Sequence, residues 1–155
     1  MHFQTTANVL AILAICLPAQ AEMAREKEPP TRGIELSKIA SGSYLGTLHC
    51  DKLPFTKGPQ QVGVDIRVDG SRISYTRSVK NETSTASAGT ETGAGTVTAN
   101  GEAKLSGGWQ GARDGYSATY SGRLSASGGK LEGEQNWTYQ GQNYRRTCSM
   151  SVTAR

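Results

Sequence analysis

The stretch at residues 131–148 carries the side chains with the most chemistry in the chain. It ends on a cysteine and places three aromatic residues and two arginines within ten positions: Trp137, Tyr139, Tyr144, Arg145 and Arg146. Aromatic faces stack on planar groups and a guanidinium binds anions, so the stretch could form a ligand platform. The same residues could instead pack one end of a barrel, with arginine laid across an aromatic ring. The two interpretations are compatible, because small barrels often hold one small ligand at the mouth.

The elements that position these residues are predicted to be β-strands. From residue 42 onward, apolar and polar residues alternate, and glycine, serine and threonine are abundant. We expect a long polar loop at residues 80–95, and hairpin turns at Asp69-Gly70 (type I′) and Asn100-Gly101. The eight expected strands lie at or near residues 43–50, 61–68, 73–79, 96–99, 103–109, 115–124, 130–139 and 143–152.

The connections between these strands are mostly short, so neighbours in sequence should be antiparallel neighbours in space. The prediction is an all-β fold: an eight-stranded antiparallel up-and-down barrel, or a β-sandwich. Closure is favoured because the first and last strands would run antiparallel, with Cys50 and Cys148 on their inward faces. We expect one disulfide between these two cysteines.

Strand parity selects the candidate ligand contacts. Trp137 and Tyr139 share the inward face of the seventh strand, and Tyr144 and Arg146 share that of the eighth, whereas Arg145 points outward. The predicted contacts of a ligand at the barrel mouth are Tyr75, Trp137, Tyr139, Tyr144 and Arg146.

The amino-terminal residues read as an export signal. Residues 9–17 form an apolar run of nine, shorter than the roughly 20 residues that span a bilayer but typical of a signal-peptide core. Ala19-Gln20-Ala21 fits a small-x-small cleavage site, so we expect a signal peptide at 1–21, a flexible lead at 22–41 and the β domain at 42–155. Removal of the signal peptide removes Cys16 and leaves Cys50 and Cys148. The predicted location is periplasmic or secreted, where these two cysteines would be oxidised.

Catalytic and metal-binding patterns are scarce. Beyond His2, the only histidine is His49, which lies on an outward position, and no nucleophile elbow, P-loop or dinucleotide fingerprint occurs. Glu132 and Glu134 lie on an outer face, where two carboxylates are typically solvated. We therefore predict no enzyme activity, no cofactor and no metal site. The net charge of +4 is modest, so we also predict no nucleic-acid binding. Beyond residues 9–17 no stretch is apolar enough for a membrane, so we predict no membrane span.

Three motifs occur in the β domain. They consist of Gly42, Tyr44, Gly46 and Cys50; of Leu105, Gly107 and Trp109; and of Leu131, Gly133, Gln135 and Trp137, followed by Arg146 and Cys148. In these motifs the chain resembles a group of small exported proteins from Gram-negative, α-proteobacterial bacteria whose function is not established. The resemblance covers residues 42–150 and implies a fold, not a reaction. More distantly, the layout is similar to calycin-type barrels, although Tyr44 stands where lipocalins carry tryptophan.

The functional prediction is a monomeric, non-catalytic exported binding protein that holds a small ligand at the barrel mouth. The alternative is an inhibitor or envelope-interaction module that acts on a protein or cell-envelope partner. That alternative would use the lead at 22–41 or the polar loop at 80–95.

Overall fold

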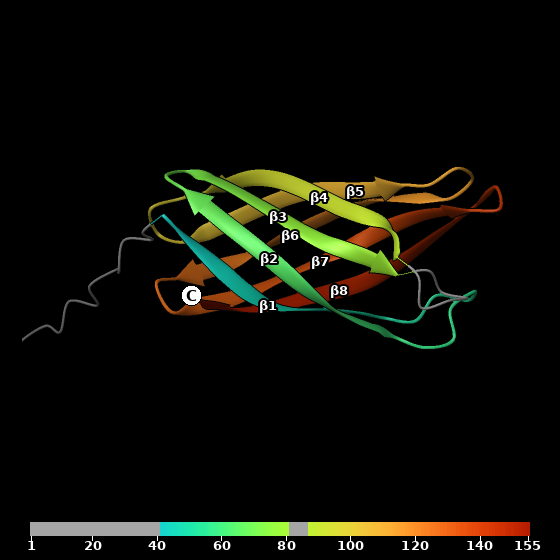
Figure 1. Ribbon diagram of the computed structural model, residues 1–155, viewed down its shortest axis with the longest axis horizontal. Helices are drawn as coiled ribbons and strands as arrows, with labels where there is room; N and C mark the ends of the chain where they lie inside the picture. The colour runs from blue at the N-terminus through green and yellow to red at the C-terminus, as the bar shows by residue number, and fades with distance from the viewer. Residues whose placement is uncertain (1–40, 81–86) are drawn as a thin grey trace, which may run out of the picture. The chain divides into compact units, whose positions relative to one another are not determined.

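The computed structural model describes residues 41–80 and 87–155, and these residues form strands and turns with no helix (Figure 1). The signal peptide and nearly all of the lead that the sequence predicts lie outside the described residues. The strands are β1 Gly42–Cys50, β2 Gln60–Asp69, β3 Arg72–Lys80, β4 Ser87–Val97, β5 Glu102–Gln110, β6 Gly115–Ser125, β7 Gly128–Tyr139 and β8 Gln142–Ala154.

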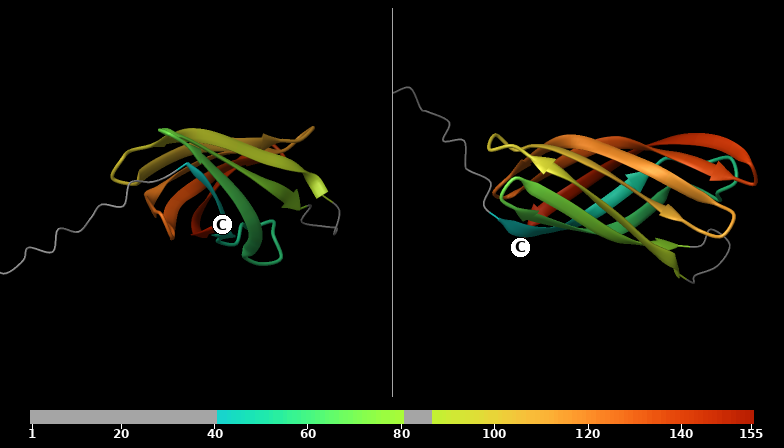
Figure 2. Two further views of the ribbon diagram at one scale, coloured as in Figure 1. Left: turned by 60° about the vertical axis from the view of Figure 1, so that its left-hand side comes forward. Right: turned by 90° about the horizontal axis from the view of Figure 1, so that it is seen from above.

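The eight strands form one closed barrel in sequence order, so the barrel prediction is confirmed over the sandwich. Every neighbouring pair is antiparallel, and β1 pairs with β8 to complete the wall, from Tyr44–Ala154 to Cys50–Cys148. The two views of Figure 2 show the strands wrapped around a common interior. Closure pairs every strand with a neighbour on both sides over at least part of its length, so no strand is an open edge along its whole length.

The predicted disulfide lies on this closing seam. Cys50 and Cys148 are register partners in the β1–β8 ladder, and their sulfur atoms are bonded. Both residues are almost fully buried. The bond spans 98 positions of sequence, for which the chain-entropy estimate is about 4–5 kcal/mol of stabilisation.

The core follows the alternation in the strand sequences. In β2, Val64, Ile66 and Val68 point inward and are buried, whereas Arg67 between them is exposed. The same alternation continues around the barrel and gives one continuous cluster of buried residues. Away from the barrel ends, a side chain on the inward parity of a strand therefore faces this core.

One predicted loop is in fact a strand. The sequence predicts a polar loop at residues 80–95 and the fourth strand only at 96–99, but β4 begins at Ser87 and pairs with β3 from Ser87 to Thr96, with one irregularity opposite Val79 and Lys80. Small residues such as Gly93 and Ala94 form the ladder through their backbone groups. The segment is rich in glycine and polar residues, so its sequence does not show the alternation of a strand. Residues 81–86 of the predicted loop lie outside the described residues.

A second correction concerns the turn between β2 and β3. Asp69 and Arg72 are register partners, so the turn consists of Gly70 and Ser71, one position later than predicted. Gly70 has a φ of +58°, and Ser71 is not among the residues with positive φ. This pattern belongs to a type II′ turn, in which glycine takes the first central position, instead of the predicted type I′.

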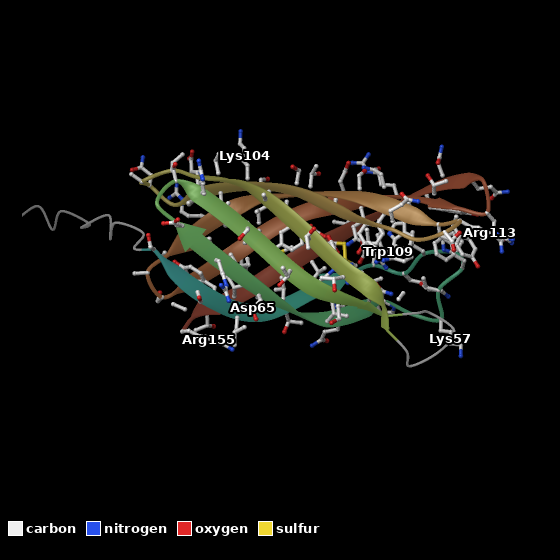
Figure 3. All side chains as sticks on the ribbon, turned by 45° about the horizontal axis from the view of Figure 1, so that its top comes forward. Lys57, Asp65, Lys104, Trp109, Arg113 and Arg155 are labelled. Atoms are coloured by element: carbon white, nitrogen blue, oxygen red, sulfur yellow. A yellow bond between two sulfur atoms is a disulfide. The ribbon has the colours of Figure 1, made fainter. Side chains whose placement is uncertain are left out.

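The two ends of the barrel differ. The turn end carries the tight connections at 70–71, 98–101 and 126–127, and the loop end carries the connections at 51–59, 111–114 and 140–141. In Figure 3, Lys57 and Arg113 mark the loop end, and Arg155 lies toward the turn end. Trp109 lies among the side chains within the barrel near the loop end, whereas Lys104 points away from it.

Candidate functional site

A buried ion pair lies inside the barrel between β3 and β4. Arg77 and Glu91 have side-chain exposures of 1% and 0%, and Arg77 Nε donates to Glu91 Oε2. The Tyr75 hydroxyl donates to Glu91 Oε1 at 2.5 Å, and the Tyr116 hydroxyl donates to Glu91 Oε2 at 2.5 Å. Arg77 Nη2 in turn donates to the Tyr116 hydroxyl at 2.6 Å. The carboxylate of Glu91 is therefore the common acceptor of three donors.

A second set of polar contacts surrounds Gln135 on the other side of the interior. The Gln135 carbonyl oxygen accepts hydrogen bonds from Arg146 Nε at 2.9 Å and from Trp137 Nε1 at 3.1 Å. Its amide nitrogen donates to the Tyr120 hydroxyl at 3.0 Å. Arg146 Nη2 also donates to Gln60 Oε1 at 2.7 Å. Gln135 is completely buried, so these bonds satisfy both ends of its amide.

The two sets are in contact through their tyrosines, whose phenols stay protonated. The rings of Tyr75 and Tyr120 meet edge to face at a centroid distance of 5.6 Å. Burial raises the pKa of Tyr75, Tyr116 and Tyr120 far above the ordinary value, and the negative charge of Glu91 raises all three further. The Tyr75 and Tyr116 phenols therefore donate to Glu91, the Tyr120 hydroxyl accepts from Gln135, and the interior is filled by its own polar side chains.

Two glycines make room for the Tyr75 ring. A Cβ atom on Gly93 would collide with that ring and would lie 2.7 Å from the Ser106 carbonyl oxygen. A Cβ atom on Gly107 would lie 2.5 Å from the Tyr75 hydroxyl. Because Gly93 on β4 and Gly107 on β5 have no side chain, the Tyr75 phenol can reach Glu91.

We predict that Gly93→Ala destabilises the barrel by about 1–3 kcal/mol, the usual cost of overpacking a filled core. The matched control is Gly63→Ala on β2, because nothing lies within 4 Å of a Cβ atom placed there. A residue other than glycine favours an extended strand, so the control should be neutral or stabilising by up to about 1 kcal/mol. Urea unfolding of both variants checks this, and equal stabilities would contradict the packing argument.

Four aromatic rings gather at the loop end and are called the end cluster: Phe55, Trp137, Tyr139 and Tyr144. Phe55 stacks on Tyr139 at a centroid distance of 4.1 Å. It also meets Trp137 at 5.8 Å and Tyr144 at 5.1 Å, in both cases edge to face. Trp137 is buried, and the other three rings are only partly buried. The end cluster therefore presents aromatic surface to solvent above a buried floor.

The β1–β2 connection holds Phe55 in place. Leu53 and Thr56 close a tight turn, in which the Thr56 amide donates to the Leu53 carbonyl oxygen at 3.0 Å. The Thr56 hydroxyl binds back to the Leu53 backbone, and both residues are buried. Phe55 lies inside this turn, directly after Pro54, whose fixed φ favours the turn. The hydrogen bonds of this turn therefore fix the position of the Phe55 ring.

The end cluster rests on the interior network through Trp137. Its ring stacks on Tyr116 at 4.3 Å, and the guanidinium carbon of Arg146 lies 5.1 Å from its centroid. Trp109 lies 6.4 Å from Trp137, and its indole nitrogen donates to the Ala88 carbonyl oxygen at 3.2 Å. Trp137, which forms the buried floor of the end cluster, is therefore held in place by Tyr116, Arg146 and Trp109.

Four of the five residues that the sequence predicts as ligand contacts come together here. Trp137, Tyr139 and Tyr144 belong to the end cluster, and Arg146 lies beneath Trp137 with only 3% of its surface exposed. Tyr75 is 1% exposed and binds Glu91 in the interior, and among the described residues its one ring contact is with Tyr120.

Sequence reasoning missed Phe55, Arg77, Glu91 and Gln135. The inward parity of β3 and β7 would have found Arg77 and Gln135, since each shares a face with the neighbouring tyrosine or tryptophan. Glu91 was hidden by the expectation of a loop at that position. Phe55 gave only the weak signal of an aromatic residue after proline in a connection.

The outer wall matches the solvated surface that parity predicts. His49 and Glu132 are exposed, and Glu134 pairs with Arg145 on the neighbouring strand β8. Across residues 41–80 and 87–155, no three His, Cys, Asp or Glu side chains gather as a metal site would require. Nor does that part of the chain contain a helix long and apolar enough to cross a membrane.

Comparison with known proteins adds no family to this description of the site. No protein-family model and no curated protein sequence matches the chain.

Proposed function

We infer that the protein is a non-catalytic binding protein, exported to the periplasm or beyond, that holds a small ligand at the loop end. The observation that carries this proposal is the end cluster, in which the partly buried Phe55 contacts the buried Trp137 and the partly buried rings of Tyr139 and Tyr144. Partly exposed aromatic rings held in fixed positions are typical of sites that stack planar or ring-shaped molecules. The apolar run at residues 9–17 supports export.

The contacts of the ligand follow from burial. Tyr139, Tyr144 and Phe55 are the rings that a ligand reaches from solvent, and Trp137 forms the floor beneath them. We assign Arg146 a supporting role, because its guanidinium binds Gln135 and Gln60 and packs against the Trp137 ring from beneath. The filled interior favours binding at the end over binding deep within the barrel.

Native mass spectrometry of the mature protein, before and after mild denaturation, tests the proposal. We expect a non-covalent mass that recurs between preparations of the wild-type protein. Both tryptophans of the chain, Trp109 and Trp137, lie at the loop end, so rebinding of the released molecule should change tryptophan fluorescence. A protein that never carries an extra mass contradicts the proposal.

The matched variants locate the site. The double variant Tyr139→Ala/Tyr144→Ala should weaken binding about tenfold or more, since each lost ring contact contributes about 0.5–1.5 kcal/mol. The control is Tyr44→Phe at the turn end, where the Tyr44 hydroxyl donates to the Ser125 carbonyl oxygen. Equal loss in the control and the double variant would assign the effect to folding, and unchanged binding in the double variant would refute the end-cluster site.

A further inference from the structure

The barrel wall opens between β2 and β3 toward the loop end. The β2–β3 ladder has only five register pairs and ends at Asp65–Thr76. Beyond that pair, β2 continues to Gln60 along β1, and β3 continues to Lys80 along β4. Figure 1 shows the two strands diverging in this direction. Each strand therefore has one paired edge and one edge that faces this gap, called here the β2–β3 gap.

The backbone groups that face the gap follow from the alternation of antiparallel pairs. Asp69 and Arg72 flank a two-residue turn and form a hydrogen-bonded pair, and every second pair from there is hydrogen-bonded. The next such pair after Asp65–Thr76 would be Gly63 and Ser78. Within the described part of the chain, no hydrogen bond joins these two residues across the gap. Their N–H and C=O groups therefore point into it.

A different gap in the same wall is filled, which sets the β2–β3 gap apart. The β4–β5 ladder ends at Thr92–Gly108, and the Trp109 indole then spans the opening by donating to the Ala88 carbonyl oxygen. Beyond the last β2–β3 pair, Val64 and Arg77 are buried in the interior. The next residue of β2 is Gly63, and nothing lies within 4 Å of a Cβ atom built there. The outer surface here has a hollow of about 450 Å³, whose lining includes Gly63, Asp65, Thr76 and Ser78.

We propose that the β2–β3 gap binds an extended peptide segment of another protein, which adds a short strand to the wall. Peptide N–H and C=O groups carry partial charges complementary to those of Gly63 and Ser78 at strand spacing. Asp65 lies in the hollow, and no cation among the described residues pairs with it. The segment should therefore carry a lysine or arginine on its outer face. Its inner face should be apolar, because Val64 and Val79 are buried beside the gap and the Arg77 guanidinium is bound to Glu91 and Tyr116.

Hydrogen exchange on the full mature chain tests this proposal. The probe is the capped peptide Thr-Val-Lys-Val-Thr at millimolar concentration, and its control is the same peptide with N-methylated amides, which cannot donate to a strand. In the free protein, the amides of Gly63 and Ser78 should exchange quickly. The probe should slow both amides by about tenfold or more, and the N-methylated control should leave them unchanged.

Two variants separate this surface from other effects. Gly63→Lys places a charged side chain at the gap and should abolish the protection of Ser78, because lysine on a strand edge opposes pairing. Its control is Thr119→Lys, an exposed position on β6 that is paired on both sides. The variant Tyr139→Ala/Tyr144→Ala should bind the probe normally, so failure of the small-ligand site and failure of this proposal are distinguishable.

Three outcomes would overturn the proposal. The first is rapid exchange of both amides at saturating probe concentration. The second is protection of both amides in the free monomeric protein, which would mean that a segment of its own chain fills the gap. The third is the same protection together with a dimeric mass in native mass spectrometry, which would mean that a second copy is the partner.

Discussion

Replacing Glu91 by glutamine should destabilise the barrel by about 3–5 kcal/mol, the usual cost of leaving a buried charge without its partner. The Arg77 side chain is buried, and within the described residues its hydrogen-bond acceptors are Glu91 and the Tyr116 hydroxyl. The amide of glutamine keeps the size of the side chain but removes the negative charge. The loss is a large part of a stability that is typically about 5–15 kcal/mol. Urea unfolding at neutral pH measures it.

Two companion variants make this result specific to the ion pair. The double variant Arg77→Met/Glu91→Gln removes both charges and should recover much of the stability, because replacing a whole buried pair is often neutral. The surface control is Glu102→Gln, whose partner Arg123 lies 3.6 Å away with both side chains about two-thirds exposed. That change should cost at most about 1 kcal/mol. Equal effects at Glu91 and Glu102 would refute the argument.

The buried network has a consequence for function. Arg77, Glu91 and Gln135 take up space that apolar residues would otherwise fill, and their hydrogen bonds require fixed side-chain positions. A barrel filled in this way leaves no room for a ligand deep inside, so binding surfaces are expected at the loop end and on the wall. The end cluster and the β2–β3 gap are such surfaces, and each has aromatic rings or backbone groups directed toward solvent.

Much of the fold could be predicted because it follows from local alternation. Val64, Ile66 and Val68 have the period of two that fixes which face of β2 is buried. The disulfide could be predicted because Cys50 and Cys148 share inward parity on the first and last strands. β4 could not be predicted in full, because its glycines and threonines pair through the backbone and leave no hydrophobic period.

The site was only partly predictable for a different physical reason. Trp137, Tyr139, Tyr144 and Arg146 are close in sequence, so strand parity places them together. Phe55 reaches them only because the connection after Cys50 folds back over the loop end, which no local pattern specifies. The position of Tyr75 likewise depends on a distant carboxylate, Glu91 on the next strand.

The buried tyrosines Tyr75, Tyr116 and Tyr120 should cause a steep loss of stability at alkaline pH. In an unfolded chain, a tyrosine has a pKa of about 10. Burial, and then the negative charge of Glu91, raise the pKa of Tyr75 in the folded barrel well beyond that value, and burial is likewise the main cause for Tyr116 and Tyr120. Above pH about 10, only the unfolded chain releases these protons, so rising pH favours unfolding. Their contribution to stability is complete below pH about 10 and falls as the pH increases above it.

The expected slope is large enough to dominate the pH profile. Each such tyrosine lowers the free energy of unfolding by about 1.4 kcal/mol per pH unit, so three lower it by about 4 kcal/mol per pH unit. The tyrosinate absorbance that comes from Tyr75, Tyr116 and Tyr120 should therefore appear in the same cooperative step as the change in far-UV circular dichroism. In Tyr120→Phe, the step should contain one tyrosinate fewer and its slope should fall by about a third, whatever the stability of that variant at neutral pH. Full ionisation of the tyrosines with an unchanged β spectrum would show that the network does not hold these protons.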